Sequence, residues 1–324
     1  MSLAAPLAAA LGPVARHGRL VLVAGLAAGA ASPVLAGAIR PHIGPLIAAL
    51  LAIAAFRIGA RAAWGALSAM AATLVLVAIL QIAVPLTVLA VERAFALTGP
   101  IALALLVMTT TAPIAGTPNL TLLVGGDPAP ALRLVVVSTA LLPATVIPVF
   151  LASGDLGEPL AVLPAAARLA GLIGLAALVG FLARARLAPD LDPPTTTIVD
   201  GLSTLVFAVV VIGVMEALAL DLRRDPASVV STAAAAFAAN FGVQIVAARL
   251  AARFGDPRAA PAIGIAAGNR NFILLLTALP DAITAPIMLF VGCYQLPMYL
   301  TPLLLGRFHR RIAANRTGDA RPPR

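Results

Sequence analysis

The sequence predicts an all-α membrane protein, with ten transmembrane helices arranged as two inverted repeats of five and with breaks in the fourth and ninth spans. Composition is the first reason: 61% of the 324 residues are hydrophobic, 11% are charged, and mean hydropathy is +1.04. The second is that Asn119 and Asn271 each open the same series, with an apolar stretch, a polar break, and an apolar run holding Leu-Pro and a second proline. The polar breaks are Asp127-Pro128 and Pro280-Asp281, and the Leu-Pro pairs are Leu142-Pro143 and Leu296-Pro297.

A spanning helix needs about 20 largely apolar residues. Ten such segments can be placed along the chain, and the first is expected to be a retained span because nine more follow it. The whole chain, 1–324, is expected to form one membrane unit without a soluble domain, with repeat one over about 17–152, repeat two over about 160–306 and a basic cytoplasmic tail over 307–324. The spans are predicted at roughly 17–38, 41–57, 66–92, 99–125, 129–152, 160–183, 198–220, 227–254, 260–279 and 282–306.

The net charge is +9, all of the basic residues counted in it are arginines, and nearly all of these arginines lie at predicted helix ends. One side of the predicted membrane topology holds most of them, and the other holds Arg40, Arg93, Arg168, Arg223 and Arg224. The positive-inside rule then places both termini in the cytoplasm, which requires an even number of spans, in a cell (inner) membrane. Membrane topology therefore explains the charge better than nucleic acid binding does, and the lipid bilayer is the expected partner, with no obligate protein partner evident.

Two segments are predicted to be unwound at membrane depth. The first, 109–119, has two prolines and a glycine within six residues near its end, ahead of Asn119. The second is Gly268-Asn269-Arg270-Asn271, a glycine followed by three strongly polar residues between apolar arms. Non-helical backbone survives in a membrane only where protein buries it or it faces a watery cavity. Two such broken helices are expected to cross and to leave free amides and carbonyls facing each other.

Enzyme and metal chemistry have little support in the sequence. Cys293 is the only cysteine, so a disulfide framework or a cysteine-based metal site within one chain is ruled out. His17, His42 and His309 lie far apart, and we expect structural roles for them. Phosphate-binding loops, zinc-protease motifs and nucleophile elbows are missing. We therefore expect no enzyme activity and no cofactor, other than a doubtful sodium ion.

These residues resemble the bile acid:sodium symporter family over essentially the whole chain. The matching pieces are Leu80-Gln81 through Pro85, Gly116-Thr117-Pro118-Asn119, Val137-Ser138-Thr139 and Gly268-Asn269-Arg270-Asn271. The resemblance implies ten spans, a core domain from spans three to five and eight to ten in which the broken spans cross, and a panel of the other four that rocks against the core. It also implies substrates that are mostly organic anions.

The chain departs from the family pattern where the resemblance implies sodium ligands. A glutamate and a glutamine expected on the ninth span are Ala266 and Arg270 here, and Pro118 replaces a Ser or Thr before Asn119. The remaining candidate sodium ligands are Gln81, Asn119 and backbone carbonyls of the type at Ala267 and Asn269. Because a carboxylate is lost and a guanidinium gained, we expect weak sodium binding.

Arg270 admits several interpretations. Its guanidinium is hypothesised to sit where a sodium ion would otherwise bind, as a fixed cation that bridges the crossing segments. The same group is suited to a substrate carboxylate or sulfate, which guanidinium binds through two parallel hydrogen bonds. The structural alternative pairs it with backbone carbonyls or with Glu216. Asn240 and Gln244 share one helix face, where they either line the core cavity or bond neighbouring helices.

The sequence is thus interpreted as that of a secondary transporter of small organic anions that works by alternating access, with sodium coupling weakened or lost. The predicted substrate contacts are Asn119, Arg270, Asn271, Thr117, Thr121 and Asn269. A conventional sodium-dependent organic anion symporter is the first alternative. A membrane sensor or scaffold with a transporter fold, without net flux, is the second, and substrate uptake in proteoliposomes separates it from both transporter hypotheses.

Overall fold

The computed structural model describes residues 4–65, 70–154 and 159–314, and over these ranges the chain is mostly helical. Within these ranges the only β-type pairing is one isolated antiparallel bridge, between Pro113 and Arg270. Among the described residues, seven helical runs are long and apolar enough to cross a bilayer, and an eighth is obtained if the bent pair α1 and α2 counts as one span. The protein is therefore built as a membrane protein. The seven runs are Pro33–Ile58, Ala71–Ala94, Pro128–Ser153, Val162–Leu187, Pro193–Arg224, Pro226–Phe254 and Asp281–Leu304.

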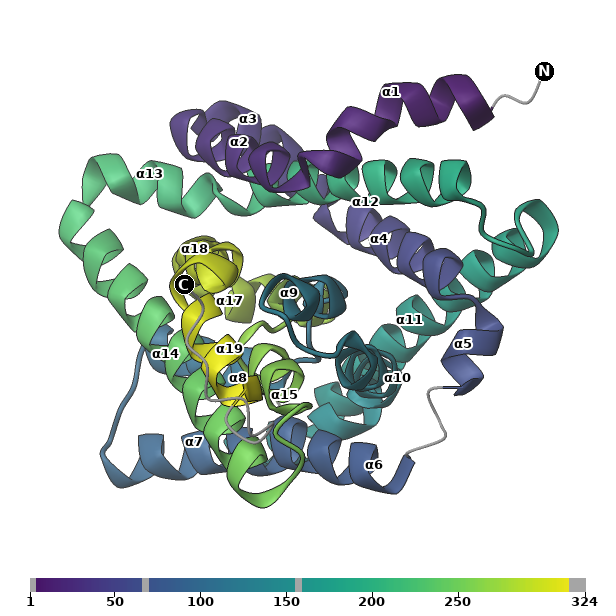
Figure 1. Ribbon diagram of the computed structural model, residues 1–324. Helices are drawn as coiled ribbons and strands as arrows, with labels where there is room; N and C mark the ends of the chain where they lie inside the picture. The colour runs from purple at the N-terminus through teal and green to yellow at the C-terminus, as the bar shows by residue number, and fades with distance from the viewer. Residues whose placement is uncertain (1–3, 66–69, 155–158, 315–324) are drawn as a thin grey trace.

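One group of helices, which we call the panel, is organised around α12 and α4. The N-terminal helices α1 to α3 and the helix α4 all pack against α12, and α4 also packs along α11. The approach of α11 to α4 is close because Gly180 has no side chain: a Cβ there would lie 2.3 Å from the Ala52 carbonyl oxygen. Figure 1 shows α1 to α3 beside α12, along one side of the molecule. The panel comprises α1 (Ala4–Arg16), α2 (Gly18–Ala31), α3 (Pro33–Ile39), η1 (Arg40–His42), α4 (Ile43–Ile58), α11 (Pro159–Leu187) and α12 (Pro193–Val214).

An ion pair fixes each end of the panel. Arg57 at the end of α4 pairs with Asp200 of α12 at 2.5 Å. At the opposite end Arg40 pairs at 2.9 Å with Glu216, the first residue of α13 (Glu216–Arg224). Glu216 is thus the partner of Arg40, and the alternative in which it pairs with Arg270 is wrong in this structure.

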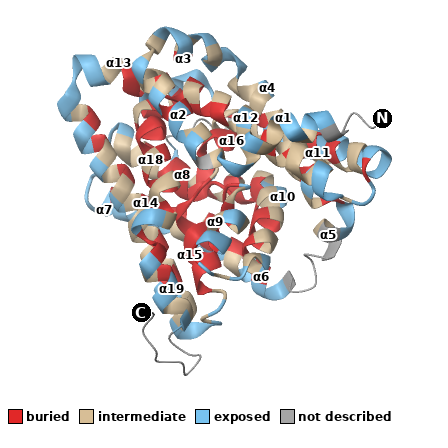
Figure 2. Cartoon of the chain, turned by 45° about the horizontal axis from the view of Figure 1, so that its top comes forward, coloured by how far each residue is buried: buried red, intermediate tan, exposed pale blue. Residues whose placement is uncertain are grey.

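The second group, which we call the core, surrounds the two broken helices. Helix α14 packs along α15 and α18, while α10 packs against α6, α9 and α15. Burial is concentrated in this group, around α8, α10, α15 and α18 (Figure 2). The core comprises α6 (Met70–Ala78), the π-helical turn η3 (Ile79–Ala83), α7 (Val84–Ala94), α8 (Pro100–Thr110), α9 (Thr117–Leu123), α10 (Pro128–Ser153), α14 (Pro226–Phe254), α15 (Ala260–Gly268), α16 (Phe272–Leu276), α17 (Asp281–Thr284), η4 (Ala285–Ile287) and α18 (Met288–Leu304).

The predicted boundaries of the first two spans, at 17–38 and 41–57, are wrong. The helix break falls at Ser32, whose hydroxyl accepts a hydrogen bond from the Leu35 N–H and so caps α3. The chain then continues through η1 as one 26-residue candidate span, Pro33–Ile58. Before the break lie α1 and α2, bent by 72° relative to each other. Arg40-Pro41 resembles a loop in sequence, but a proline in the first turn of η1 is compatible with a continuing helix.

The start of the predicted third span, 66–69, lies outside the described residues, as does 315–324 of the predicted tail. The first part of that tail is helical in the structure: α19, Gly306–Ala314, packs against α14, α15 and α18. A short helix, α5 (Ala60–Gly65), follows α4.

Candidate functional site

The two broken helices meet through a short antiparallel backbone pairing, which we call the crossover. The Asn271 N–H donates to the Ala112 carbonyl at 2.7 Å, and the Ile114 N–H donates to the Asn269 carbonyl at 3.0 Å. Pro113 and Arg270 therefore face each other between the ends of α8 and α15 and the starts of α9 and α16. This pairing satisfies backbone groups that the helix breaks release. The predicted unwinding of both segments is confirmed.

Two prolines leave carbonyls without helical partners beside the crossover. In α8 the Thr109 carbonyl would accept from the residue four positions on, but that residue is Pro113, which has no N–H. In η3 the bonding is shifted by one position, so that the Val84 N–H donates to Ile79. The equivalent donor for the Leu80 carbonyl would be Pro85, which again has none. Both free carbonyls are buried in the core and need a donor from elsewhere.

Arg270 supplies that donor. Its guanidinium donates through Nη2 to the carbonyls of Leu80 and Thr109, and through Nη1 to the carbonyl of Thr111 at 2.9 Å. The residue is only 1% exposed, and its Nε is buried without a partner. All of its partners are neutral carbonyls. The geometry is that of a cation bridging α8 and η3, as the fixed-cation hypothesis expects, and it is also the structural alternative of pairing with backbone carbonyls.

A second set of polar groups holds the other side of the crossover. The Arg270 N–H donates to the Tyr294 hydroxyl at 3.0 Å, and that hydroxyl donates to the Gly268 carbonyl. Asn240 donates to the same carbonyl at 2.7 Å and to Asn269 Oδ1 at 3.0 Å. Asn240 therefore bonds one helix to another, as one of its two alternatives proposed. Asn269 is fully buried by these contacts.

The predicted substrate contacts divide into accessible and enclosed residues. Asn119 on α9 is exposed and Asn271 is partly exposed, and the described structure gives neither side-chain amide a hydrogen-bond partner. Thr117 and Thr121 are instead buried, and their hydroxyls donate to the carbonyls of Ile114 and Thr117. In this conformation the two asparagines are available to a ligand, whereas the threonines, Asn269 and Arg270 are enclosed.

The candidate sodium ligands do not form one open cluster. Gln81 is buried, donates to the Ser138 carbonyl at 3.2 Å and accepts from Thr145 at 3.4 Å. Its amide is therefore engaged within the core, away from the exposed Asn119. Ala267 retains a carbonyl whose usual helical donor, the Asn271 N–H, is used elsewhere.

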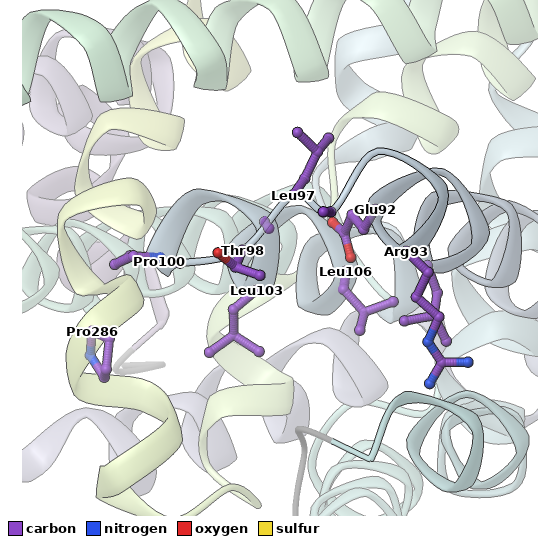
Figure 3. A pocket seen from close by; sticks show the side chains of 12 residues that line it. Glu92, Arg93, Leu97, Thr98, Pro100, Leu103, Leu106 and Pro286 are labelled. Atoms are coloured by element: carbon purple, nitrogen blue, oxygen red, sulfur yellow. The ribbon is translucent and has the colours of Figure 1, made fainter.

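Two cavities flank the core. The first, of about 440 Å³, lies at the outer end of α8 and is drawn in Figure 3. Arg93 at its edge donates to the carbonyls of Ala152 and Ser153. The crossover is at the other end of α8, a helix length of about 16 Å away. This cavity is therefore separate from the site.

The second cavity, of about 520 Å³, lies between panel and core. Panel residues from α3, η1, α4 and α12 line one wall, and residues of α16 and those leading into α18 line the other. Helix α16 begins directly after Asn271, so this wall leads to the crossover. The lining combines apolar side chains with Arg40, Asp281 and two threonines, so the accessible wall is at least as polar as it is apolar, which suits a small amphipathic ligand. The lining residues are Gly37, Arg40, Pro41, Ile43, Gly44, Val214, Ile273, Leu276, Thr277, Leu279, Asp281, Thr284 and Met288.

Comparison of the chain with models of protein families finds no match, and comparison with curated proteins finds none either.

Three functional candidates were not predicted as such from the sequence. Tyr294 bonds to both Arg270 and Gly268 of the second broken segment, Thr301 bonds to Gln244 at 2.9 Å, and His309 is buried against Gln244 at 3.2 Å. Gln244 lies four residues after Asn240 on one face, which was the only sequence signal for this network. Tyr294 gave no signal, because an isolated tyrosine in an apolar run is common at helix interfaces.

Proposed function

We propose that this protein is a secondary transporter of small organic anions, in which panel and core move relative to each other by alternating access. The observation that carries the proposal is the buried guanidinium of Arg270 at the crossover, together with the accessible, unpartnered amides of Asn271, its neighbour in the chain, and Asn119, on the helix that follows the crossover. Ionisable groups at membrane depth usually mark substrate or ion pathways. Irregular backbone there is tolerated where it is buried in protein or lines a cavity.

The charge of Arg270 favours an anionic substrate. Its described partners are carbonyls, and the described salt bridges join other residues, so no carboxylate neutralises it directly. At an effective dielectric constant of about 20, an anion about 8 Å from the guanidinium gains roughly 2 kcal/mol, which is about 30-fold in affinity. Asn271 adjoins Arg270 in the chain, so we propose that an anion held by its amide would lie within about this range. The substrate headgroup would thus bind against Asn271 and Asn119 without direct contact to the guanidinium in this conformation.

The same arrangement supports a transporter with weak or lost sodium coupling. Three backbone carbonyls already accept hydrogen bonds from the positively charged guanidinium of Arg270. The candidate ligand Gln81 is hydrogen-bonded to Ser138 and Thr145. A sodium ion at this position would compete with a covalently attached cation. Exchange, uniport or proton coupling are the modes consistent with such a built-in charge.

In this proposal the bent pair α1–α2 and the two broken runs, α8–α9 and α15–α16, each count as one span and bring the total to ten. Both termini then lie in the cytoplasm of a cell (inner) membrane, as the arginine distribution predicts. The panel is α1 to α4, α11 and α12, and the core is spans three to five and eight to ten. The cavity between Arg40 and α16 is the approach from the extracytoplasmic side.

Substrate flux tests the proposal directly. The purified protein is reconstituted into proteoliposomes that are loaded with a mixture of small organic anions. Uptake of labelled carboxylates and sulfates from the outside, in exchange for the loaded anions, is then followed. We expect trans-stimulated, saturable uptake of at least one anion, and weaker uptake in Asn271→Ala. Ligand binding without flux in either direction would instead support a sensor or scaffold.

Sodium dependence is tested separately by thermal unfolding in detergent, with potassium replaced by sodium at constant ionic strength. A specifically bound ion stabilises by about 2.7 kcal/mol at a hundredfold excess over Kd. We expect no shift for the natural sequence and a sodium-dependent rise for the double variant Ala266→Glu, Arg270→Gln. A rise in the natural sequence that is lost on mutating Gln81 or Asn119 would restore the sodium symporter alternative.

A further inference from the structure

A continuous chain of buried hydrogen bonds connects the crossover to the C-terminal helix α19. His309 of α19 lies 3.2 Å, Nε2 to Oε1, from Gln244. Gln244 donates through Nε2 to Asn240 Oδ1 at 2.6 Å, and Asn240 donates to the Gly268 carbonyl and to Asn269. Every donor in this chain points from α19 toward the crossover. The position of α19 is therefore linked to the backbone that holds Arg270.

The donor directions define which ring nitrogen of His309 carries a hydrogen. Gln244 uses its Nε2 as a donor, so the atom facing His309 is the acceptor Oε1, and His309 Nε2 must carry the hydrogen. The other ring nitrogen, Nδ1, is buried without a partner. The ring also packs closely on α15, because a Cβ at Gly264 would lie 3.1 Å from His309 Cε1. A neutral imidazole fits this pocket, and a second ring proton would have no acceptor.

The charges around His309 also oppose its protonation. Helix α14 contributes Arg249 and Arg253, and Arg249 lies over the neighbouring Phe308 ring at 5.6 Å. Helix α15 has no titratable residue, and α18 contributes Cys293, Tyr294 and Tyr299, which are neutral near pH 7. Helix α19 itself adds exposed Arg307, Arg310 and Arg311. No described carboxylate pairs with His309, so an imidazolium here would be an uncompensated buried cation.

We propose that His309 is a pH-sensitive latch: the neutral ring docks α19 on the core, and protonation releases α19 together with the Gln244 and Asn240 contacts that support the crossover. Once α19 is released, water can accept a hydrogen bond from the second ring proton of His309. The arginine-bearing helix then moves toward solvent. The Gln244 carbonyl oxygen is then left to find another donor, which loosens the support of Gly268 and Asn269. On the proposed function, acidification of the compartment that α19 faces would alter the transport rate.

The strength of the latch follows from proton linkage. Burial lowers the pKa of His309 from its ordinary 6.5 to about 4 while α19 is docked. Docking is therefore fully supported above the ordinary value and is lost progressively as pH falls from 6.5 toward 4. Between about pH 7.5 and about pH 5 this difference weakens docking by about 30-fold.

Hydrogen exchange followed by mass spectrometry on the full chain tests the latch without substrate. Exchange is measured at about pH 7.5 and about pH 5 and corrected for the intrinsic pH dependence of amide exchange. We expect protection over 305–314 to fall by up to about 30-fold at the lower pH, with a smaller fall over 268–272. His309→Gln should remove the pH response, while the exposed-histidine controls His17→Gln and His42→Gln should retain it.

A second variant reverses the effect. Gln244→Glu places a carboxylate against His309 Nε2, which stabilises the imidazolium, so α19 should stay protected at the lower pH. The latch is wrong if protection in the natural sequence is independent of pH, if the response persists in His309→Gln, or if Gln244→Glu releases α19 as before. A response confined to α19 would refute the link to the crossover. Because hydrogen exchange is measured without substrate, it tests the latch even if the transport assay fails and the proposed function is wrong.

Discussion

Replacing Arg270 with methionine tests how much the bridging guanidinium stabilises the core. Methionine keeps an unbranched apolar side chain, shorter than that of arginine, and removes the three donated hydrogen bonds. Leaving buried carbonyls unpaired costs about 1–3 kcal/mol each in soluble proteins, while measured side-chain hydrogen bonds between membrane helices average only about 0.6 kcal/mol. Removing the buried charge also removes its desolvation cost, which offsets part of this loss of stability. We therefore expect a net loss of roughly 2–5 kcal/mol.

Arg93 provides a matched control for this substitution. It also donates to backbone carbonyls, those of Ala152 and Ser153, but it is exposed, so water replaces its bonds. Arg93→Met should cost no more than about 1 kcal/mol. Both variants are compared by unfolding of the purified protein in mixed detergent micelles with increasing denaturing detergent. Equal midpoints for Arg270→Met and the natural sequence, or equal losses in the two variants, would refute the reasoning.

The remaining predictions use three other features. Asn119→Asp should leave stability within about 0.5 kcal/mol, because its amide has no described partner, whereas Asn271→Asp should raise stability by up to roughly 2 kcal/mol through attraction to Arg270; both should abolish anion binding measured by titration, since each adds negative charge. Gly180→Val should destabilise by about 1–3 kcal/mol by forcing α11 from α4, whereas Gly174→Val, with open space around it, should have little effect in the same unfolding assay. Asp225→Ala removes the cap at the start of α14, and its cost of about 1 kcal/mol should appear as faster exchange of the first-turn amides.

The sequence predicted the crossover because its causes are local. Proline and glycine interrupt helices through their own geometry, so the breaks near Pro113 and Gly268 were visible without tertiary information. The free carbonyls were predictable in principle as well, since Pro113 follows Thr109 by four residues. What sequence alone leaves open is the partner of each carbonyl. Arg270 is far away in the chain and meets them only because the two halves cross.

Features that depend on packing between distant elements were missed. The first two spans were divided at Arg40-Pro41, because local sequence does not distinguish a proline in a continuing helix from one in a loop. Helix α19 has many arginines and was predicted as a tail, yet buried His309 anchors it through a contact with α14. The sequence also could not predict that Asn119 is exposed while Asn269 is buried, because exposure depends on which side of the crossover the neighbouring helices cover.

The bonding of Arg270 also sets an order for assembly in the membrane. The carbonyls of Leu80, Thr109 and Thr111 belong to the first half of the chain, whereas their donor belongs to the second. While the ribosome is still making the second half, these three acceptors lie in the bilayer without their final partner. The first half of the chain therefore lacks the donor for these carbonyls until the second half is made. Completion of the core is a late step, set by the arrival of a single arginine.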